Sequence, residues 1–95
     1  MKLYFRNQHN EEIFIAECKT IQEVNDVMKQ FLDEHNYKSY YTRIWYEPKG
    51  TNTPLQIRKD DRFIYDFGSW SEFIELEISD EEIDTLPDNM KKLMI

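Results

Sequence analysis

The stretch Asp66-Phe67-Gly68-Ser69-Trp70-Ser71-Glu72-Phe73 contains one of the two glycines of this chain, set between bulky aromatic residues. With the run Tyr40-Tyr41-Thr42-Arg43-Ile44-Trp45 it belongs to a segment, residues 40–73, that holds nine of the fourteen aromatic residues. A glycine between aromatics at the end of a strand-like run is typical of a sharp bend with a positive φ. We therefore expect Gly68 and its aromatic neighbours to specify the fold.

The segment before this region has the pattern of an amphipathic helix. Thr20 and Glu23 have the spacing of a capping box, which satisfies two amide donors at a helix start. Asn36 is a plausible residue for the helix end. Between them a single apolar stripe follows helical spacing and consists of Ile21, Val24, Val27, Met28, Phe31 and Leu32. The pattern predicts a helix of about four turns packed on a sheet.

Alternating and β-branched runs predict six strands, at residues 2–5, 13–18, 38–46, 54–58, 62–67 and 73–78. We expect the first two to form a hairpin, and those at 54–58 and 62–67 a second hairpin. In the last strand Ile74, Leu76 and Ile78 alternate with Glu75 and Glu77, which predicts one buried and one solvated face. Ser79 and Glu82 form a second capping-box pattern that begins a short acidic helix.

This order predicts an α+β fold in one domain, residues 1–95, with an acidic C-terminal extension at residues 79–95. We expect a mainly antiparallel sheet with one amphipathic helix packed on a face. The predicted core consists of Leu3, Ile15, Val24, Val27, Phe31, Ile44, Phe67 and Leu76.

The charge is unevenly distributed along the chain. Its net value is −7 at pH 7, with a net of +1 in residues 1–59 and −8 in residues 60–95. Direct binding to nucleic acid or to an anionic membrane is not expected, since both need a basic surface. The acidic C-terminal part of the chain could bind a basic surface on another protein. The alternative is that it is a solvated tail that only aids solubility. The single cysteine, Cys18, and the lack of a signal-like or membrane-spanning run predict a cytoplasmic protein. The sequence leaves open whether it is a monomer or a homodimer.

No catalytic or metal-binding constellation stands out, so we expect neither enzymatic activity nor a cofactor. Cys18, His9 and His35 are too far apart in sequence to predict a metal site. Asp66-Phe67-Gly68 matches three letters of the protein kinase metal-binding motif, but the other kinase motifs are absent. An alternative is a small enzyme whose site is built around Asp66, Ser69 and Arg43.

The segment Ser39-Tyr40-Tyr41-Thr42-Arg43 and the stretch from Asp66 to Phe73 resemble a group of small acidic proteins encoded by phages and prophages of Gram-positive bacteria. The resemblance covers roughly residues 20–76. It implies a phage origin and hence the cytoplasm of a bacterial host. The group has no established activity, so the resemblance carries over no functional residues. This chain differs from the group by its acidic extension past Ile78.

The leading hypothesis is an accessory protein that binds another protein and performs no chemistry. The candidate contact residues near the bend are Arg43, Trp70 and Glu72. The alternative is an acidic DNA mimic that inhibits a host DNA-binding or defence protein. It would present Glu75 and Glu77 on one strand face, about 6.6–6.8 Å apart, which is close to two base-pair steps along one DNA strand.

Overall fold

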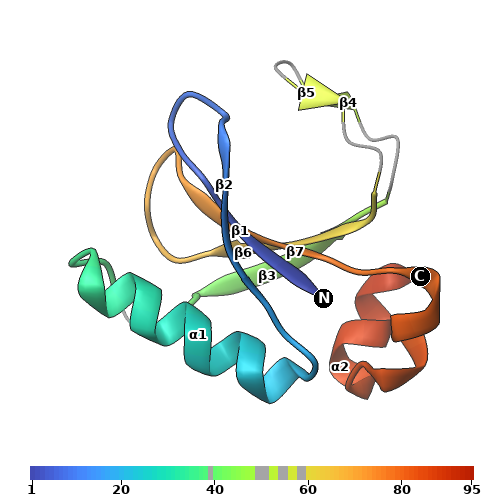
Figure 1. Cartoon of the computed structure of the whole chain (residues 1–95). Helices are drawn as coiled ribbons and strands as arrows, with labels where there is room; N and C mark the ends of the chain where they lie inside the picture. The colour runs from blue at the N-terminus through green and yellow to red at the C-terminus, as the bar shows by residue number, and fades with distance from the viewer. Residues whose placement is uncertain (39, 49–51, 54–55, 58–59) are drawn as a thin grey trace.

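The computed structural model describes residues 1–38, 40–48, 52–53, 56–57 and 60–95, with the backbone alone at residues 52–53 and 56–57. Its centre is a five-stranded antiparallel sheet with the strand order β2-β1-β7-β6-β3 (Figure 1). These strands are β1 (Lys2–Arg6), β2 (Glu12–Glu17), β3 (Arg43–Glu47), β6 (Arg62–Asp66) and β7 (Phe73–Glu77). The predicted α+β class with an antiparallel sheet is confirmed.

The long helix α1 (Ile21–Glu34) lies across one face of this sheet (Figure 1). Thr20 caps it by accepting a hydrogen bond from the Glu23 amide at 3.1 Å, while the Glu23 carboxylate accepts one from the Lys19 amide at 3.1 Å. The helix ends at Glu34 with His35 as its C-cap, and Asn36, the residue expected to stop it, follows with a left-handed φ of 61°. The amide of Tyr37 then donates to the Leu32 carbonyl at 2.9 Å, the six-to-one bond of a Schellman motif.

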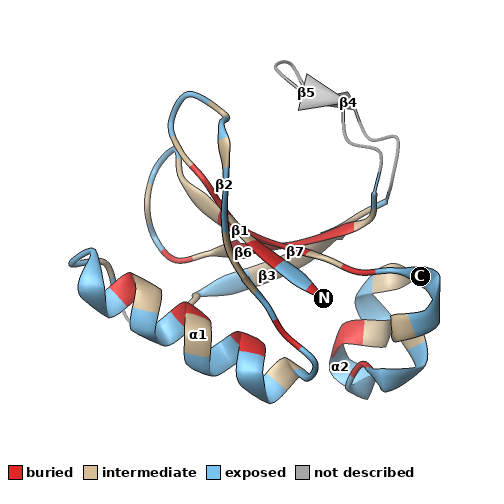
Figure 2. Ribbon diagram, in the orientation of Figure 1, coloured by how far each residue is buried: buried red, intermediate tan, exposed pale blue. Residues whose placement is uncertain are grey.

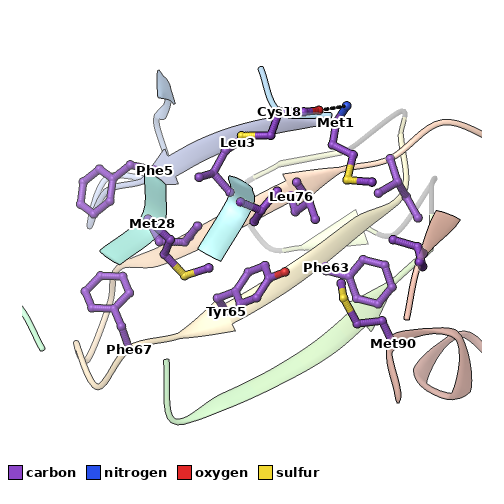
Figure 3. Close-up of a cluster of buried hydrophobic side chains, with 14 of the residues drawn as sticks. Met1, Leu3, Phe5, Cys18, Met28, Phe63, Tyr65, Phe67, Leu76 and Met90 are labelled. Atoms are coloured by element: carbon purple, nitrogen blue, oxygen red, sulfur yellow. Dashed lines mark hydrogen bonds between the residues drawn. The ribbon is translucent and has the colours of Figure 1, made fainter. Parts of the chain in front are cut away.

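The main core lies between α1 and the sheet. Figure 2 shows buried residues in the central strands and along one side of α1, and Figure 3 shows how side chains from β1, β6, β7 and α1 meet there. Among the predicted core residues, Leu3, Val24, Phe67 and Leu76 are buried. The other four, Ile15, Val27, Phe31 and Ile44, are only partly buried and pack against the core from its margin.

The predicted hairpin of residues 54–58 with 62–67 is wrong. β5 (Gln56–Ile57) pairs with β4 (Asn52–Thr53) in a separate two-stranded ribbon, and β6 pairs with β3 and β7 in the main sheet. The remainder of the predicted 54–58 strand lies outside the described residues. Sequence proximity suggested the hairpin, but the apolar residues of β6 find their partners on strands that are more distant in sequence.

The acidic C-terminal segment folds back beside the N-terminus. It begins with a 3-10 helix, η1 (Asp80–Thr85), followed by the short helices α2 (Asp88–Lys91) and η2 (Lys92–Met94). The predicted capping box of Ser79 and Glu82 is present at its start. The Glu82 carboxylate accepts hydrogen bonds from the amide and from the hydroxyl of Ser79, each at 3.0 Å. The same carboxylate pairs with the amino group of Met1, so this segment is joined to β1 as well as packed through Leu86 and Met90.

Candidate functional site

Two loops meet at the end of the sheet where β6 leaves and β3 begins. We call this region the loop end, and it comprises residues 37–38, 40–43 and 66–72. The Thr42 amide donates to the Asp66 carbonyl at 2.7 Å, and the Thr42 hydroxyl donates to the same oxygen at 3.1 Å. These bonds fix the two loops relative to each other, so side chains from both form one surface.

Gly68 makes the predicted bend, with a φ of +92°. Its amide donates to the Asp66 carboxylate at 2.9 Å, which closes the turn. A Cβ at this position would meet its nearest neighbour, the Lys38 side chain, at 3.6 Å, an ordinary contact. Glycine is therefore required by the backbone conformation and not by lack of space.

Glu72 holds the loop together from its other side. Its Oε1 accepts hydrogen bonds from the Ser69 hydroxyl at 2.9 Å and from the Tyr37 hydroxyl at 3.0 Å. Burial, and next the hydrogen bond to Glu72, raise the pKa of Tyr37 above its ordinary value, so this hydroxyl remains a donor at neutral pH. Glu72 is half-buried and engaged within the protein, which makes it a residue that positions the loop more than a contact residue.

Trp70 projects from this fixed loop into solvent. Its exposed fraction is 98%, and Tyr40, on the neighbouring loop, is 70% exposed. A large aromatic side chain that is left in water gains nothing for folding, while tryptophan and tyrosine contribute strongly when a partner buries them. Trp70 is therefore the strongest candidate for a contact residue at the loop end.

Arg43 lies at the border of the loop end with 69% of its side chain exposed. Its guanidinium stands 3.6 Å from the Asp66 carboxylate and 4.7 Å from the centre of the Trp45 ring. An exposed ion pair of this kind contributes little to stability. The Arg43 head group is thus held near Asp66 and remains available to a partner.

A shallow hollow of about 280 Å³ adjoins the loop end. Tyr40 and Tyr41 form one wall, and the other wall comes from α1 through Asn25, Asp26, Met28 and Lys29. Tyr41 is held in place by an edge-to-face contact with Tyr65 at 4.8 Å. Sequence reasoning missed this hollow because it depends on where residues 40–41 pass beside the helix, and no local pattern encodes that passage.

The predicted solvated row of Glu75 and Glu77 is wrong for Glu75, whose exposed fraction is 0%. Arg6 and Arg62 come from the strands on either side of β7, and their guanidinium nitrogens lie 3.0 and 3.5 Å from the Glu75 carboxylate. Arg62 also pairs with Glu77 at 2.9 Å, and Tyr4 donates to Glu77 at 3.2 Å. On the face opposite α1, Glu75 is therefore enclosed by ion pairs instead of being exposed to water.

An aromatic ring lies against the guanidinium of each of these arginines. The Arg6 guanidinium lies 4.9 Å from the centre of the Phe73 ring, and that of Arg62 lies 5.0 Å from the centre of the Tyr4 ring. Such contacts favour a desolvated cation. We call Arg6, Arg62 and Glu75 the ionic cluster. Arg6, Arg62 and Glu75 project from the same face of the sheet. The alternation within each strand is visible in the sequence, but only the strand order shows that the three side chains meet.

The three residues of the alternative enzyme hypothesis take part in two different sets of contacts. Asp66 is bound to the Gly68 amide and lies near Arg43, while the Ser69 hydroxyl donates to Glu72. A nucleophilic serine needs a base that accepts its proton and a third group that orients the base. The structure brings Arg43 and Asp66 together, and it places Ser69 in a separate hydrogen bond.

The other residues considered for chemistry also have structural partners. Nδ1 of His35 lies 2.8 Å from the Phe31 carbonyl, and its ring stacks on Phe31. Cys18 is buried, and that burial raises the pKa of its thiol. Within the described part of the chain, no three His, Cys, Asp or Glu side chains gather as metal ligands would, and no helix is long and apolar enough to cross a membrane.

Comparison with protein-family models, curated proteins and solved structures found no match to this chain. The loop end, with its fixed turn and its exposed Trp70, is the candidate binding surface that the geometry supports best.

Proposed function

We propose that this protein is a non-catalytic module that binds another protein through the loop end, with Trp70 as the central contact. The observation that carries the proposal is the 98% exposure of Trp70 on a loop that internal hydrogen bonds already fix. Burying this side chain in a partner would remove a large apolar surface from water.

The order of the loop supports this function energetically. Binding by a flexible loop must offset the loss of its conformational freedom, whereas a preformed loop avoids most of that cost. Here Gly68, Ser69 and Glu72 are all engaged in bonds that hold the turn. Tyr40 and the hollow beside it extend the surface, and Arg43 adds one charged group at its border.

The setting of this binding follows from the resemblance to small phage and prophage proteins. We propose an accessory role in the cytoplasm of an infected or lysogenic bacterial cell, with a phage or host protein as the partner. The hydrogen bonds that engage Asp66 with Gly68 and Ser69 with Glu72 favour such a role over the alternative enzyme at these residues.

A photo-crosslinking experiment tests the proposal. A benzophenone amino acid replaces Trp70 in one version of the protein and Gln22, which is exposed on α1, in a control version. We expect irradiation in bacterial cells to give a discrete protein adduct from position 70 and not from position 22. With that partner purified, Trp70→Ala should weaken binding at least roughly tenfold, about 1.4 kcal/mol.

Ile95→Ala is the control for this measurement, because Ile95 is another fully exposed large apolar residue and lies on a different part of the surface. It should leave the affinity for the crosslinked partner unchanged. Identical adducts from positions 70 and 22, or equal affinities of the Trp70→Ala variant and the unchanged protein, would contradict binding through the loop end.

The DNA-mimic alternative loses the pair of residues on which it was based, since Glu75 lies between two arginines. A charge-mimicking surface would instead depend on Asp60, Asp61, Asp80 and Glu81, which line a hollow next to η1. A double variant, Asp80→Lys with Glu81→Lys, separates the two functions. It would abolish binding by an acidic mimic and leave binding through Trp70 intact.

A further inference from the structure

The two edge strands of the sheet differ in what covers them. β3 forms one edge, and the C-terminal helix η2 packs beside it. β2 forms the other edge, and among the described residues it pairs only with β1. Its outward-facing amide and carbonyl groups therefore lack a strand partner within the described part of the chain, which is the condition for adding a further strand.

β2 also presents apolar side chains that an isolated edge would be expected to avoid. Ile13 is 50% exposed and Phe14 is 55% exposed, and the Phe14 ring is steadied by an edge-to-face contact with Tyr4 at 5.8 Å. The register of β2 against β1 shifts after Phe14, so the regular part of the strand is short. A bulge limits pairing along an edge strand, so a strand added to β2 would be short.

The charges around β2 indicate the chemistry of that segment. Glu11 and Glu17 are exposed at the two ends of the strand. An antiparallel copy of β2 centred between Phe14 and Ile15 would bring Glu17 of one chain against Glu12 of the other, and like charges directly opposite each other are destabilising. An extended segment with apolar residues in its middle and lysine or arginine at its ends would instead meet both acidic groups favourably.

We propose that the β2 edge is a second binding site, which takes up an extended segment with an apolar centre and basic ends by adding it to the sheet as a sixth strand. This site is separate from the loop end and does not depend on Trp70. Main-chain hydrogen bonds along β2 would supply affinity, Ile13 and Phe14 would contact the apolar side chains, and Glu11 and Glu17 would select the basic ends.

The test uses the whole protein and two capped peptides, Lys-Val-Thr-Val-Thr-Val-Lys and Glu-Val-Thr-Val-Thr-Val-Glu. We expect the first to bind at least roughly tenfold more tightly than the second, with an affinity that falls as salt screens the charges. Amide hydrogen exchange supplies a structural readout. Binding should slow exchange at amides of residues 12–17, which contact with side chains alone would not do.

Glu17→Lys should lower the affinity for the basic peptide roughly tenfold, while Asp84→Lys, the same charge change on η1, should leave it unchanged. Circular dichroism melts establish that both variants fold, and Trp70→Ala should bind the peptide normally. The proposal is overturned by equal binding of both peptides, by exchange that slows elsewhere, or by no binding at millimolar peptide. Concentration-dependent dimerisation through β2 would also overturn it, because a second copy would then be the occupant.

Discussion

Three consecutive residues of β7, Ile74, Glu75 and Leu76, are all completely buried, yet they face opposite sides of the sheet. Ile74 and Leu76 join the apolar cluster beneath α1, whereas Glu75 meets Arg6 and Arg62 on the other side. Burial is thus achieved by apolar packing on one face and by compensated charge on the other. The first gains from removal of apolar surface from water, and the second must offset the cost of taking ions out of water.

The difference between the faces bears on strand register. A one-residue slip of β7 would exchange its faces, placing Glu75 beneath α1 and an apolar residue between the two arginines. Apolar side chains tolerate many neighbours, but a buried carboxylate needs its cations at hydrogen-bonding distance. We infer that the ionic cluster helps to select the register of β7 between β1 and β6, and the apolar face supplies most of the stabilisation.

The largest expected effect comes from Glu75→Ala. Removing this carboxylate leaves Arg6 and Arg62 buried without it, so we expect a loss of about 3–5 kcal/mol in the free energy of unfolding. Urea denaturation followed by circular dichroism measures it. Glu77→Ala, on the same strand face but partly exposed, is the control and should cost less. A loss of under about 0.5 kcal/mol for Glu75→Ala would mean that the ionic cluster is solvated.

Leu76→Ala tests the other face of the same strand. Leu76 is fully buried beneath α1, so the lost contacts and the remaining cavity should cost about 2–5 kcal/mol. The same substitution at Leu93, 38% exposed near the C-terminus, is the control and should cost much less. Calorimetric melts of both variants give the comparison. Equal costs for Leu76 and Leu93 would show that the apolar face does not provide the stabilisation assigned to it.

Gly68→Ala tests the turn that lets Phe67 remain in the apolar core while the chain passes from β6 to β7. The Cβ of an alanine has room here, but the alanine backbone must adopt a φ near +92°. We therefore expect a loss of about 1–2 kcal/mol in the free energy of unfolding. Thermal unfolding measures it, with Ser71→Ala on the same loop as the control. A raised melting temperature for Gly68→Ala would mean that the bend relaxes to an ordinary conformation.

Glu82→Gln tests the ion pair between Glu82 and the Met1 amino group, which is more exposed than the ionic cluster. Burial raises the pKa of Glu82, but hydrogen bonds from the Met1 amino group and Ser79, and the amine charge, outweigh it and lower the pKa overall. A lowered folded-state pKa stabilises the protein above the ordinary value of about 4.3, and this stabilisation is lost as pH falls through the lowered value.

At pH 7 we therefore expect Glu82→Gln to cost about 1 kcal/mol. The difference between the variant and the unchanged protein should narrow as the pH falls below about 4. Urea denaturation at a series of pH values measures both quantities. A difference that stays constant with pH would assign the contribution of Glu82 to packing and not to its charge.

Local patterns predicted the elements whose causes are local. The cap at Thr20, the apolar stripe from Ile21 to Leu32 and the left-handed residue at Gly68 all depend on neighbours within a few positions, and the structure has them. Of the three residues expected to be exposed near the bend, Trp70 and Arg43 are exposed. Glu72 is half-buried, because its carboxylate accepts hydrogen bonds from Tyr37 and Ser69. Whether Trp70 and Arg43 bind a partner remains a prediction.

Features that depend on strand order were missed. Apolar and acidic residues alternate along β7, which predicts that Glu75 is solvated. The arginines that neutralise it come from β1 and β6, and the pattern within β7 does not show them. β5 pairs with β4 and not with β6, although the lengths of the intervening segments permit either pairing. The hollow beside Tyr40 likewise needs the position of α1 relative to residues 40–41, which periodicity does not give.

The position of β1 between β2 and β7 affects how the chain folds during its synthesis. β1 pairs with β2 directly, but its other neighbour is β7, so Leu3 lies opposite Leu76. β7 emerges from the ribosome after α1 and the other strands of the sheet. Until then, one side of β1 has no strand partner. Long-range pairings of this kind slow folding and leave an apolar hairpin open to wrong contacts. We expect nascent chains that stall before β7 to depend on chaperones, and folding to be completed only after the last strand emerges.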